Sequence, residues 1–232
     1  MFKLSIFIVG ACAGYLLLGC GKENVVTSPL DHLDGASLLG LVNNRTMNYL
    51  QTDTIVLIDS TYSVTVTTSS RVIKISGGGN GWIIKDGDLP LVNLKLTNES
   101  VIQNGYWRAV DGHDSLFYFA APPVVMHRSL SGGGGWDGYT PSYETDSSSL
   151  VLLFYYCYFG FFFEKQYAEN VHLLLPAGSF DTYRFDVDLF VNPSDTTPVV
   201  QIKEYYAPAV GLVKLHLKAG ALKRTLSLVE VN

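Results

Sequence analysis

The side chains of this chain that could do covalent chemistry are first of all its three cysteines, Cys12, Cys20 and Cys157. A thiol can serve as a nucleophile, a metal ligand or half of a disulfide, and its surroundings decide between these roles. Cys20 follows an almost purely apolar stretch, Leu4–Leu18, and polar residues begin directly after it. That stretch is shorter than the roughly 20 residues that a membrane-spanning helix needs. With Lys3 ahead of it, the pattern is typical of a secretory signal peptide.

The four residues Leu17-Leu18-Gly19-Cys20 resemble the bacterial lipobox, in which the cysteine becomes the lipidated first residue of the mature protein. We therefore predict a signal peptide over residues 1–19, cleavage after Gly19, and a diacylglyceryl group on the Cys20 sulfur. Acyl chains such as palmitate anchor a protein at about 0.8 kcal/mol per buried methylene, so two or three chains hold firmly. The alternative is an ordinary signal peptide that happens to end near a cysteine. By analogy with lipoproteins of diderm bacteria, Gly21 favours the outer membrane within the cell envelope.

The remaining cysteine and the histidines do not predict a metal site or a cofactor. Cys157 lies inside an apolar run, where a thiol behaves as a small hydrophobe, and one cysteine cannot form an internal disulfide. No two of the five histidines are spaced by two or four residues. The one cluster of acids with a histidine, at 111–114, contains the Asp and Gly that a turn needs.

Catalytic and nucleotide-binding signatures are also missing from the sequence. No Gly-x-Ser-x-Gly motif occurs, although a triad assembled from distant positions leaves no signature. Asp186 and Asp188 lie two residues apart, which in a strand puts both on one face about 7 Å apart. A glycosidase could use such a pair, but a solvated strand face explains it as well. The glycine-rich stretch 76–82 has no Lys-Ser/Thr after it, and the basic residues are scattered, so neither a nucleotide nor a nucleic acid is indicated. We predict that the chain is not an enzyme.

Two groups of aromatic residues are candidate binding residues. Trp136 and Tyr139 lie close together in a glycine-rich stretch, where exposed rings could stack on sugars, or Trp136 could simply begin a strand. The charge-free run 150–163 has three interpretations. It is a central strand buried on both faces, or it is an exposed patch for a membrane or a partner, or one of its faces lines an apolar cavity. In the last case the lining residues would include Phe154, Tyr156 and Tyr158.

The elements that would position these residues are strands. Hydrophobic residues make up 47 % of the chain and charged residues 16 %, and apolar side chains alternate with polar ones in several segments. The segments 62–67, 92–96, 185–191 and 213–217 each predict an antiparallel strand that is buried on one face and solvated on the other. Turn residues separate them, and no long amphipathic helix is indicated.

We therefore predict an all-β fold with few or short helices, built from roughly ten or more strands. The large antiparallel sheet would be curved into a half-barrel or closed into a barrel. The predicted domain spans residues 37–232, and residues 20–36 hold the lipidated cysteine and a polar tether.

Several blocks in the C-terminal half resemble a known group of proteins. They are PPVVMHRSLSGGGGW (122–136), PAGSFDTYRFDV (176–187), EYYAPAVGLVKLHLK (204–218) and RTLSLVEVN (224–232). Together they are similar to a broad group of bacterial envelope lipoproteins, some of which resemble half-barrels of the Lol lipoprotein-carrier type. The group usually has Gly at position 209, where this chain has Ala209. The resemblance implies a curved sheet and lends no catalytic residue. It also implies bends at Gly178 and near Pro208.

These observations leave three functional hypotheses. The leading one is a non-catalytic, membrane-anchored envelope lipoprotein whose curved sheet binds an apolar ligand or a protein partner. The second is a structural or assembly lipoprotein with a filled interior, no ligand and a protein partner. The third is a surface module that binds carbohydrate with Trp136 and its neighbours. A large apolar cavity would favour the first hypothesis. A packed interior with an exposed sheet edge would favour the second, and a flat aromatic platform would favour the third.

Overall fold

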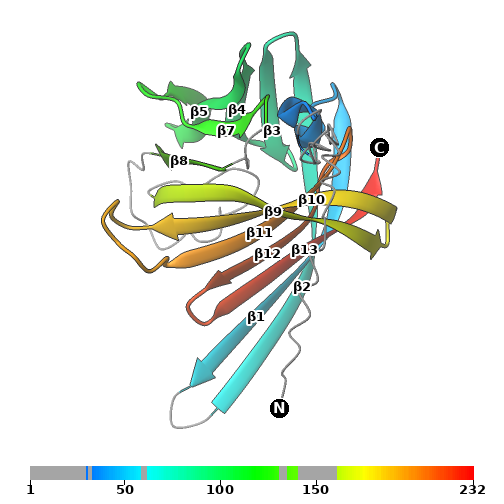
Figure 1. The fold of residues 1–232 in the computed structure, drawn as a ribbon, viewed down its shortest axis with the longest axis vertical. Coiled ribbons are helices and arrows are strands. Elements are labelled where there is room, and N and C mark those ends of the chain that lie inside the picture. The colour runs from blue at the N-terminus through cyan, green and yellow to red at the C-terminus, as the bar shows by residue number, and fades with distance from the viewer. Residues whose placement is uncertain (1–29, 31–32, 59–61, 131–134, 141–160) are drawn as a thin grey trace, which may run out of the picture.

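A computed structural model describes residue 30 and residues 33–58, 62–130, 135–140 and 161–232. Thirteen strands in these residues form one antiparallel sheet that curls without closing (Figure 1). The order of twelve strands across the sheet is β6-β5-β4-β3-β2-β1-β13-β12-β11-β10-β9-β8, and β7 pairs with β5 beside this path. The prediction of a curved all-β sheet is confirmed.

The elements run as follows along the chain. They are the 3₁₀ helix η1 (Gly35–Leu39) and the strands β1 (Arg45–Ile58), β2 (Tyr62–Gly78), β3 (Gly81–Asp86), β4 (Leu89–Leu96), β5 (Ser100–Val110), β6 (His113–Tyr118), β7 (Val124–His127), β8 (Gly135–Thr140), β9 (Phe161–Leu175), β10 (Gly178–Phe190), β11 (Val200–Ala207), β12 (Gly211–Ala219) and β13 (Leu222–Val231). No helix among the described residues has the length and apolar character needed to cross a membrane.

The alternation in the C-terminal segments predicts the buried face correctly. Phe185, Val187 and Leu189 on β10 have no exposed surface, and the apolar residues of β12 are equally buried. Register continues this face from strand to strand, because Val187 lies opposite Ile202 and Leu215 lies opposite Leu226. The concave side of the curled sheet is therefore the hydrophobic core, and the polar residues that alternate with these side chains cover the outer face.

The bends that the resemblance implied lie between β9 and β12. Gly178 has a φ of 134° at the start of β10, directly after the two-residue turn at Pro176. Between β11 and β12, Ala209 has a φ of 61°, in the left-handed region that glycine adopts without strain. The chain thus makes this turn with an alanine in a conformation that favours glycine.

The helix η1 fills the concave side between the two ends of the curled sheet. Leu38 and Leu39 are fully buried, and the helix packs against β11 and β12 on one side and β5 and β7 on the other. Asp34 begins it, because its carboxylate accepts a hydrogen bond from the Ala36 amide at 3.0 Å. The same carboxylate pairs with Arg128 at 2.7 Å, and the hydrogen bonds from Arg128 hold the pKa of Asp34 below its ordinary value. The helix η1, which we call the plug, is thereby fixed to the β7 end of the sheet.

The strands β1 and β2 extend past the rest of the sheet as a projecting hairpin (Figure 1). The pairing of β2 with β3 begins only at Ile73, and that of β1 with β13 ends at Ile55. The prediction of a half-buried strand at 62–67 is wrong here, because Tyr62 and Val66 are 71 % and 59 % exposed. Alternation places these side chains on one face, but no described element covers that face.

Candidate functional site

The concave interior, where an apolar ligand would lie, is filled by the chain itself over the described residues. Met47, Ile73, Phe185 and Leu226 have no exposed surface, and they belong to one continuous cluster of buried side chains. The predicted cavity residues Phe154, Tyr156 and Tyr158 lie outside the described residues, so that lining stays a prediction. At the described end of the same apolar run, Phe163 is buried.

A buried ion pair lies within this interior. The Lys165 ammonium and the Glu204 carboxylate are 2.6 Å apart, and their side chains are 0 % and 1 % exposed. The Tyr206 hydroxyl donates to the same carboxylate at 2.8 Å. Burial lowers the pKa of Lys165, and the neighbouring Glu204 carboxylate acts against that shift. Because each charge has its partner and hydrogen bonds, the pair is tolerated in the core, where a lone charge would not be.

Three aromatic rings surround the Lys165 ammonium, and one of them belongs to a candidate sugar-binding residue. The ring centroids of Trp136, Phe185 and Tyr206 lie 5.5, 5.5 and 5.1 Å from the nitrogen. The half-buried Trp136 also donates its indole N–H to the Val124 carbonyl at 3.0 Å. Its ring thus contacts the core and joins β7 to β8.

Tyr139, the other candidate ring on β8, points to the opposite face. Its side chain is exposed, and its ring stacks on Phe162 with centroids 4.4 Å apart. Successive side chains of a strand alternate between faces, so Trp136 and Tyr139 cannot share one platform on β8. The structure does not bring the two predicted rings together.

A second group of ion pairs lies where the core gives way to the projecting hairpin. The Arg224 guanidinium binds both oxygens of Asp53, at 2.7 and 2.8 Å, and joins β13 to β1. Hydrogen bonding from Arg224 holds the pKa of Asp53 below its ordinary value of 3.8. Arg71 on β2 bonds Gln51 at 3.0 Å and Asp86 at 2.7 Å. Beyond this polar layer, the hairpin has no charged side chain among its described residues 54–58 and 62–70.

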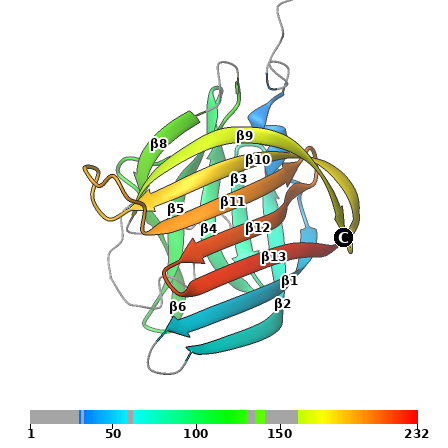
Figure 2. The same cartoon turned by 60° about the horizontal axis from the view of Figure 1, so that its bottom comes forward.

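The outer edge of the projecting hairpin is the first candidate binding surface. Over residues 62–70, which we call the free edge of β2, the described chain pairs this strand with β1 alone. The free edge borders the sheet in Figure 2, and Val64 and Val66 are exposed beside it. An uninterrupted run of unpaired backbone N–H and C=O groups can accept another strand.

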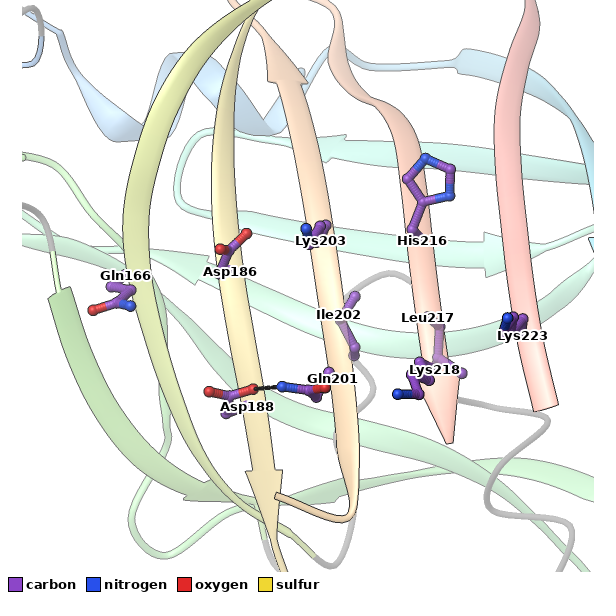
Figure 3. A pocket seen from close by; sticks show the side chains of 10 residues that line it. All are labelled: Gln166, Asp186, Asp188, Gln201, Ile202, Lys203, His216, Leu217, Lys218 and Lys223. Atoms are coloured by element: carbon purple, nitrogen blue, oxygen red, sulfur yellow. Dashed lines mark hydrogen bonds between the residues drawn. The ribbon is translucent and has the colours of Figure 1, made fainter. Parts of the chain in front are cut away.

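The outer face of β9–β13 is the second candidate binding surface. A hollow of about 570 Å³ there is lined by ten residues, Gln166, Asp186, Asp188, Gln201, Ile202, Lys203, His216, Leu217, Lys218 and Lys223 (Figure 3). The pair Asp186 and Asp188, which the sequence placed on one face of a strand, lies together in its wall. Gln201 donates to Asp188 at 3.3 Å. Sequence reasoning missed the lysines opposite, because strand register and not spacing along the chain brings them here.

His216 on β12 is one of the residues that line this hollow. Burial, and then the nearby Lys214 and Lys203, lower the pKa of its imidazole. The Thr225 hydroxyl lies 3.0 Å from its Nδ1 atom, and its ring meets Tyr205 edge-on. The neutral imidazole therefore adds a hydrogen-bonding group to the basic side of the hollow. Within the described residues, no group of three or more His, Cys, Asp or Glu side chains has a geometry that could hold a metal ion.

No family model matches the sequence, and no curated protein matches it significantly. A β-barrel-like protein of a domain of unknown function from Brucella abortus is 6 % identical with a TM-score of 0.46, over 82 % of this chain and 98 % of that one. A candidate lipoprotein of Parabacteroides distasonis is 10 % identical with a TM-score of 0.37, over 86 % and 99 % of the two chains.

A LolA superfamily protein from Nitrosomonas europaea is 4 % identical with a TM-score of 0.34, over 86 % of this chain and 93 % of that one. The sequence blocks behind the resemblance to envelope lipoproteins stay a prediction. No ligand, activity or partner transfers to this chain at these identities and scores.

Proposed function

We propose that this protein is a membrane-anchored lipoprotein of the bacterial cell envelope that binds a protein partner by strand addition along the free edge of β2. The anchor would be the lipid on Cys20, exposed by cleavage after Gly19, and the outer membrane is the expected site. The function would be binding without catalysis. The observation that carries the proposal is that the free edge of β2, residues 62–70, is exposed and free of charge.

The free edge lacks the features that usually protect a sheet edge. Proteins blunt such edges with lysines, prolines, bulges or short strands. Residues 62–70 contain no charge and no proline, and their pairing with β1 shows no register shift. Every one of these side chains is exposed, and valine, threonine and tyrosine, which favour strands, make up most of them. Such an edge is either an aggregation hazard or a place where another strand is added.

A protein strand suits this edge better than a lipid surface. The exposed Tyr62, Val64 and Val66 are apolar enough to enter a membrane, but the backbone beside them is not. In hydrocarbon, each unpaired N–H or C=O group costs roughly several kcal/mol of free energy. An open sheet edge is therefore not tolerated within a membrane. An added strand satisfies the same groups, and its side chains meet valines on one face and hydroxyls on the other.

Photocrosslinking in the envelope of cells that make the full lipidated chain tests the proposal. A photoreactive residue at Val64 should give an adduct with protein. Thr68→Lys, which places a charge on the free edge, should remove that adduct because edge lysines block strand addition. Thr52→Lys is the matched control, since Thr52 lies opposite Thr68 but on β1, which is paired on both sides at this point.

Three outcomes decide the proposal. A protein adduct that survives Thr52→Lys and disappears with Thr68→Lys supports it, and mass spectrometry of the adduct identifies the partner. An adduct with lipid alone would overturn it in favour of a membrane contact. A protein adduct that persists at full yield in Thr68→Lys would also overturn it, because binding would then not use the edge. Circular dichroism of both variants checks that the fold is intact.

A further inference from the structure

The outer face of β8–β13 sorts its charges by sign along a row that crosses the strands. Strand register places the side chains of this row directly opposite one another. In order from β8 to β13, the row consists of Asp137, Glu164, Asp188, Gln201, Lys218 and Lys223. Three carboxylates, one amide and two ammonium groups thus follow one another across six strands.

The next row along the strands has the same polarity. It begins with Gln166 on β9 and continues through Asp186 on β10 and Lys203 on β11 to His216 on β12. Asp186 pairs with Arg184 on its own strand, with 3.0 Å between the guanidinium Nε and the carboxylate. The first row therefore has carboxylates on β8–β10 and lysines on β12 and β13, and the second has a carboxylate on β10 and a lysine and an imidazole on β11 and β12.

This order is unfavourable for the isolated protein. Like charges directly opposite each other on neighbouring strands are destabilising, whereas alternating signs would be stabilising. Glu164 faces Asp188, and Lys218 faces Lys223. Within the described residues, none of these four side chains forms an ion pair. The arrangement leaves both signs available for a molecule that supplies the opposite charges.

The surface along the two rows is hollowed. The hollow of about 570 Å³ contains the lysines, His216 and the pair Asp186 and Asp188. A second hollow of about 340 Å³ contains Asp137 and Glu164. The two share Gln166, Asp186 and Asp188 in their walls, so together they form one groove, which we call the polar groove. One end of it is acidic and the other basic.

We propose that the polar groove binds a short extended peptide with two free ends, its ammonium group on the carboxylates and its terminal carboxylate on the lysines. Strands in a sheet lie about 4.8 Å apart, so Asp188 and Lys218 are separated by roughly 10 Å and Glu164 and Lys223 by roughly 19 Å. An extended peptide rises about 3.3 Å per residue, which gives a length of about three to six residues. The site is independent of the strand addition proposed for β2.

The middle of the groove suits a peptide backbone. Gln201 stands between the acidic and the basic ends, and its amide can both donate to a carbonyl and accept from an N–H. The imidazole of His216, opposite Lys203 in the second row, offers a further hydrogen-bonding group. A simple anion would use only the basic end, and a simple cation only the acidic end. A zwitterion of this length uses both ends and the amide between them.

Calorimetric titration of the mature chain with alanine peptides tests the proposal. Tetraalanine with free ends should bind, and both its N-acetylated form and its C-amidated form should bind about tenfold more weakly, because each lacks one charge. Dialanine should bind more weakly as well, since it cannot span the two ends. Inorganic phosphate serves as the probe for an anion site. Phosphate binding as tight as that of tetraalanine, no heat of binding with any peptide, or equal affinity for blocked and free peptides would each overturn the proposal.

Charge-neutral variants at the two ends assign the orientation. Lys218→Gln should weaken the binding of tetraalanine about tenfold but leave the C-amidated peptide unchanged. Asp188→Asn should do the same for the free peptide and leave the N-acetylated peptide unchanged. Lys95→Gln removes the same charge from β4, outside the groove, and should have no effect. Equal losses in Lys95→Gln and Lys218→Gln would overturn the site, because only the net charge would then matter.

Discussion

Charged side chains are distributed in opposite ways over the body of the sheet, β8–β13, and over its projecting hairpin. On β8–β13, strands that are almost all paired on both sides have charges on the outer face and even an ion pair inside the core. On the free edge of β2, which lacks a second neighbour, the side chains are uncharged. Charges that serve only to prevent aggregation would be arranged the other way round, since edges need them most.

The two proposed binding surfaces would explain this difference in the placement of charge. The row from Asp137 to Lys223 keeps like charges together at a cost to stability, which makes sense if another molecule completes it. The absence of charge along the free edge of β2, residues 62–70, leaves its backbone available, which makes sense if another strand pairs with it. Each part of the comparison can be tested by substitutions that should behave differently in the two regions.

The largest effect should come from breaking the ion pair inside the body. Lys165→Met leaves the Glu204 carboxylate buried without its cation, and the free energy of unfolding should fall by about 3–5 kcal/mol. The double variant Lys165→Met with Glu204→Leu removes both charges and should recover most of that loss. Urea denaturation of the mature chain measures both. If the single variant were as stable as the parent, the pair would not contribute as its burial implies.

The next effect compares two valines that the sequence pattern treats alike. Val187→Ala in the body removes fully buried methyl groups and should cost about 2 kcal/mol of unfolding free energy. Val66→Ala on the hairpin should change stability by less than about 0.5 kcal/mol, because the side chain is mostly exposed. Parallel urea titrations check the contrast. Equal losses in the two variants would mean that the hairpin is covered in solution.

The polar layer between the two regions predicts a dependence on pH. Asp53 has a pKa below 3.8 in the folded protein because Arg224 binds it, so its stabilisation is complete above the unfolded value and is lost as the pH falls through the folded value. Asp53→Asn should cost about 1.5–3 kcal/mol at pH 7. The free energy of unfolding of the Asp53→Asn variant should decline less than that of the parent between pH 5 and pH 3. Urea titrations at each pH measure this difference. Parallel pH curves would contradict this assignment.

The smallest effect concerns a turn in the body. Ala209 adopts a φ of 61°, which costs an L-residue about 1–2 kcal/mol, and glycine avoids that cost at the expense of a more flexible unfolded chain. Ala209→Gly should therefore stabilise the protein by about 0.5–1 kcal/mol. Thermal unfolding followed by circular dichroism measures the change. A lower melting temperature would show that the turn is not strained.

Much of the fold could be predicted from the sequence because alternation reports which side of a strand is apolar. It identified the buried faces of β4, β10 and β12. It failed at Tyr62–Thr67, because register continues Val66 through Thr54 to Lys223 on the outer face, so the apolar side chains of this segment lie on the side away from the core. The absence of charge over 62–70, together with the many hydroxyl side chains, is the signal that could have revealed the hairpin.

The candidate sites depend on register, which sequence does not contain. Asp53 and Arg224 are 171 positions apart and meet because β1 pairs with β13. In the same way, Asp188 and Lys218 become neighbours in the polar groove only through β11. Spacing along one strand predicted the pair Asp186 and Asp188, and nothing in the sequence predicted the lysines across from it.

The position of β1 has a mechanical consequence. This strand lies between β2 and β13, and the plug η1 stands just before it in the chain. A tension applied from the N-terminal side would first load the bonds of Asp34 with Arg128 and then pull β1 along its own length. Hydrogen bonds on both sides of the strand would then be sheared together, not opened one at a time. The fold is built to resist force at the end where we expect the lipid anchor.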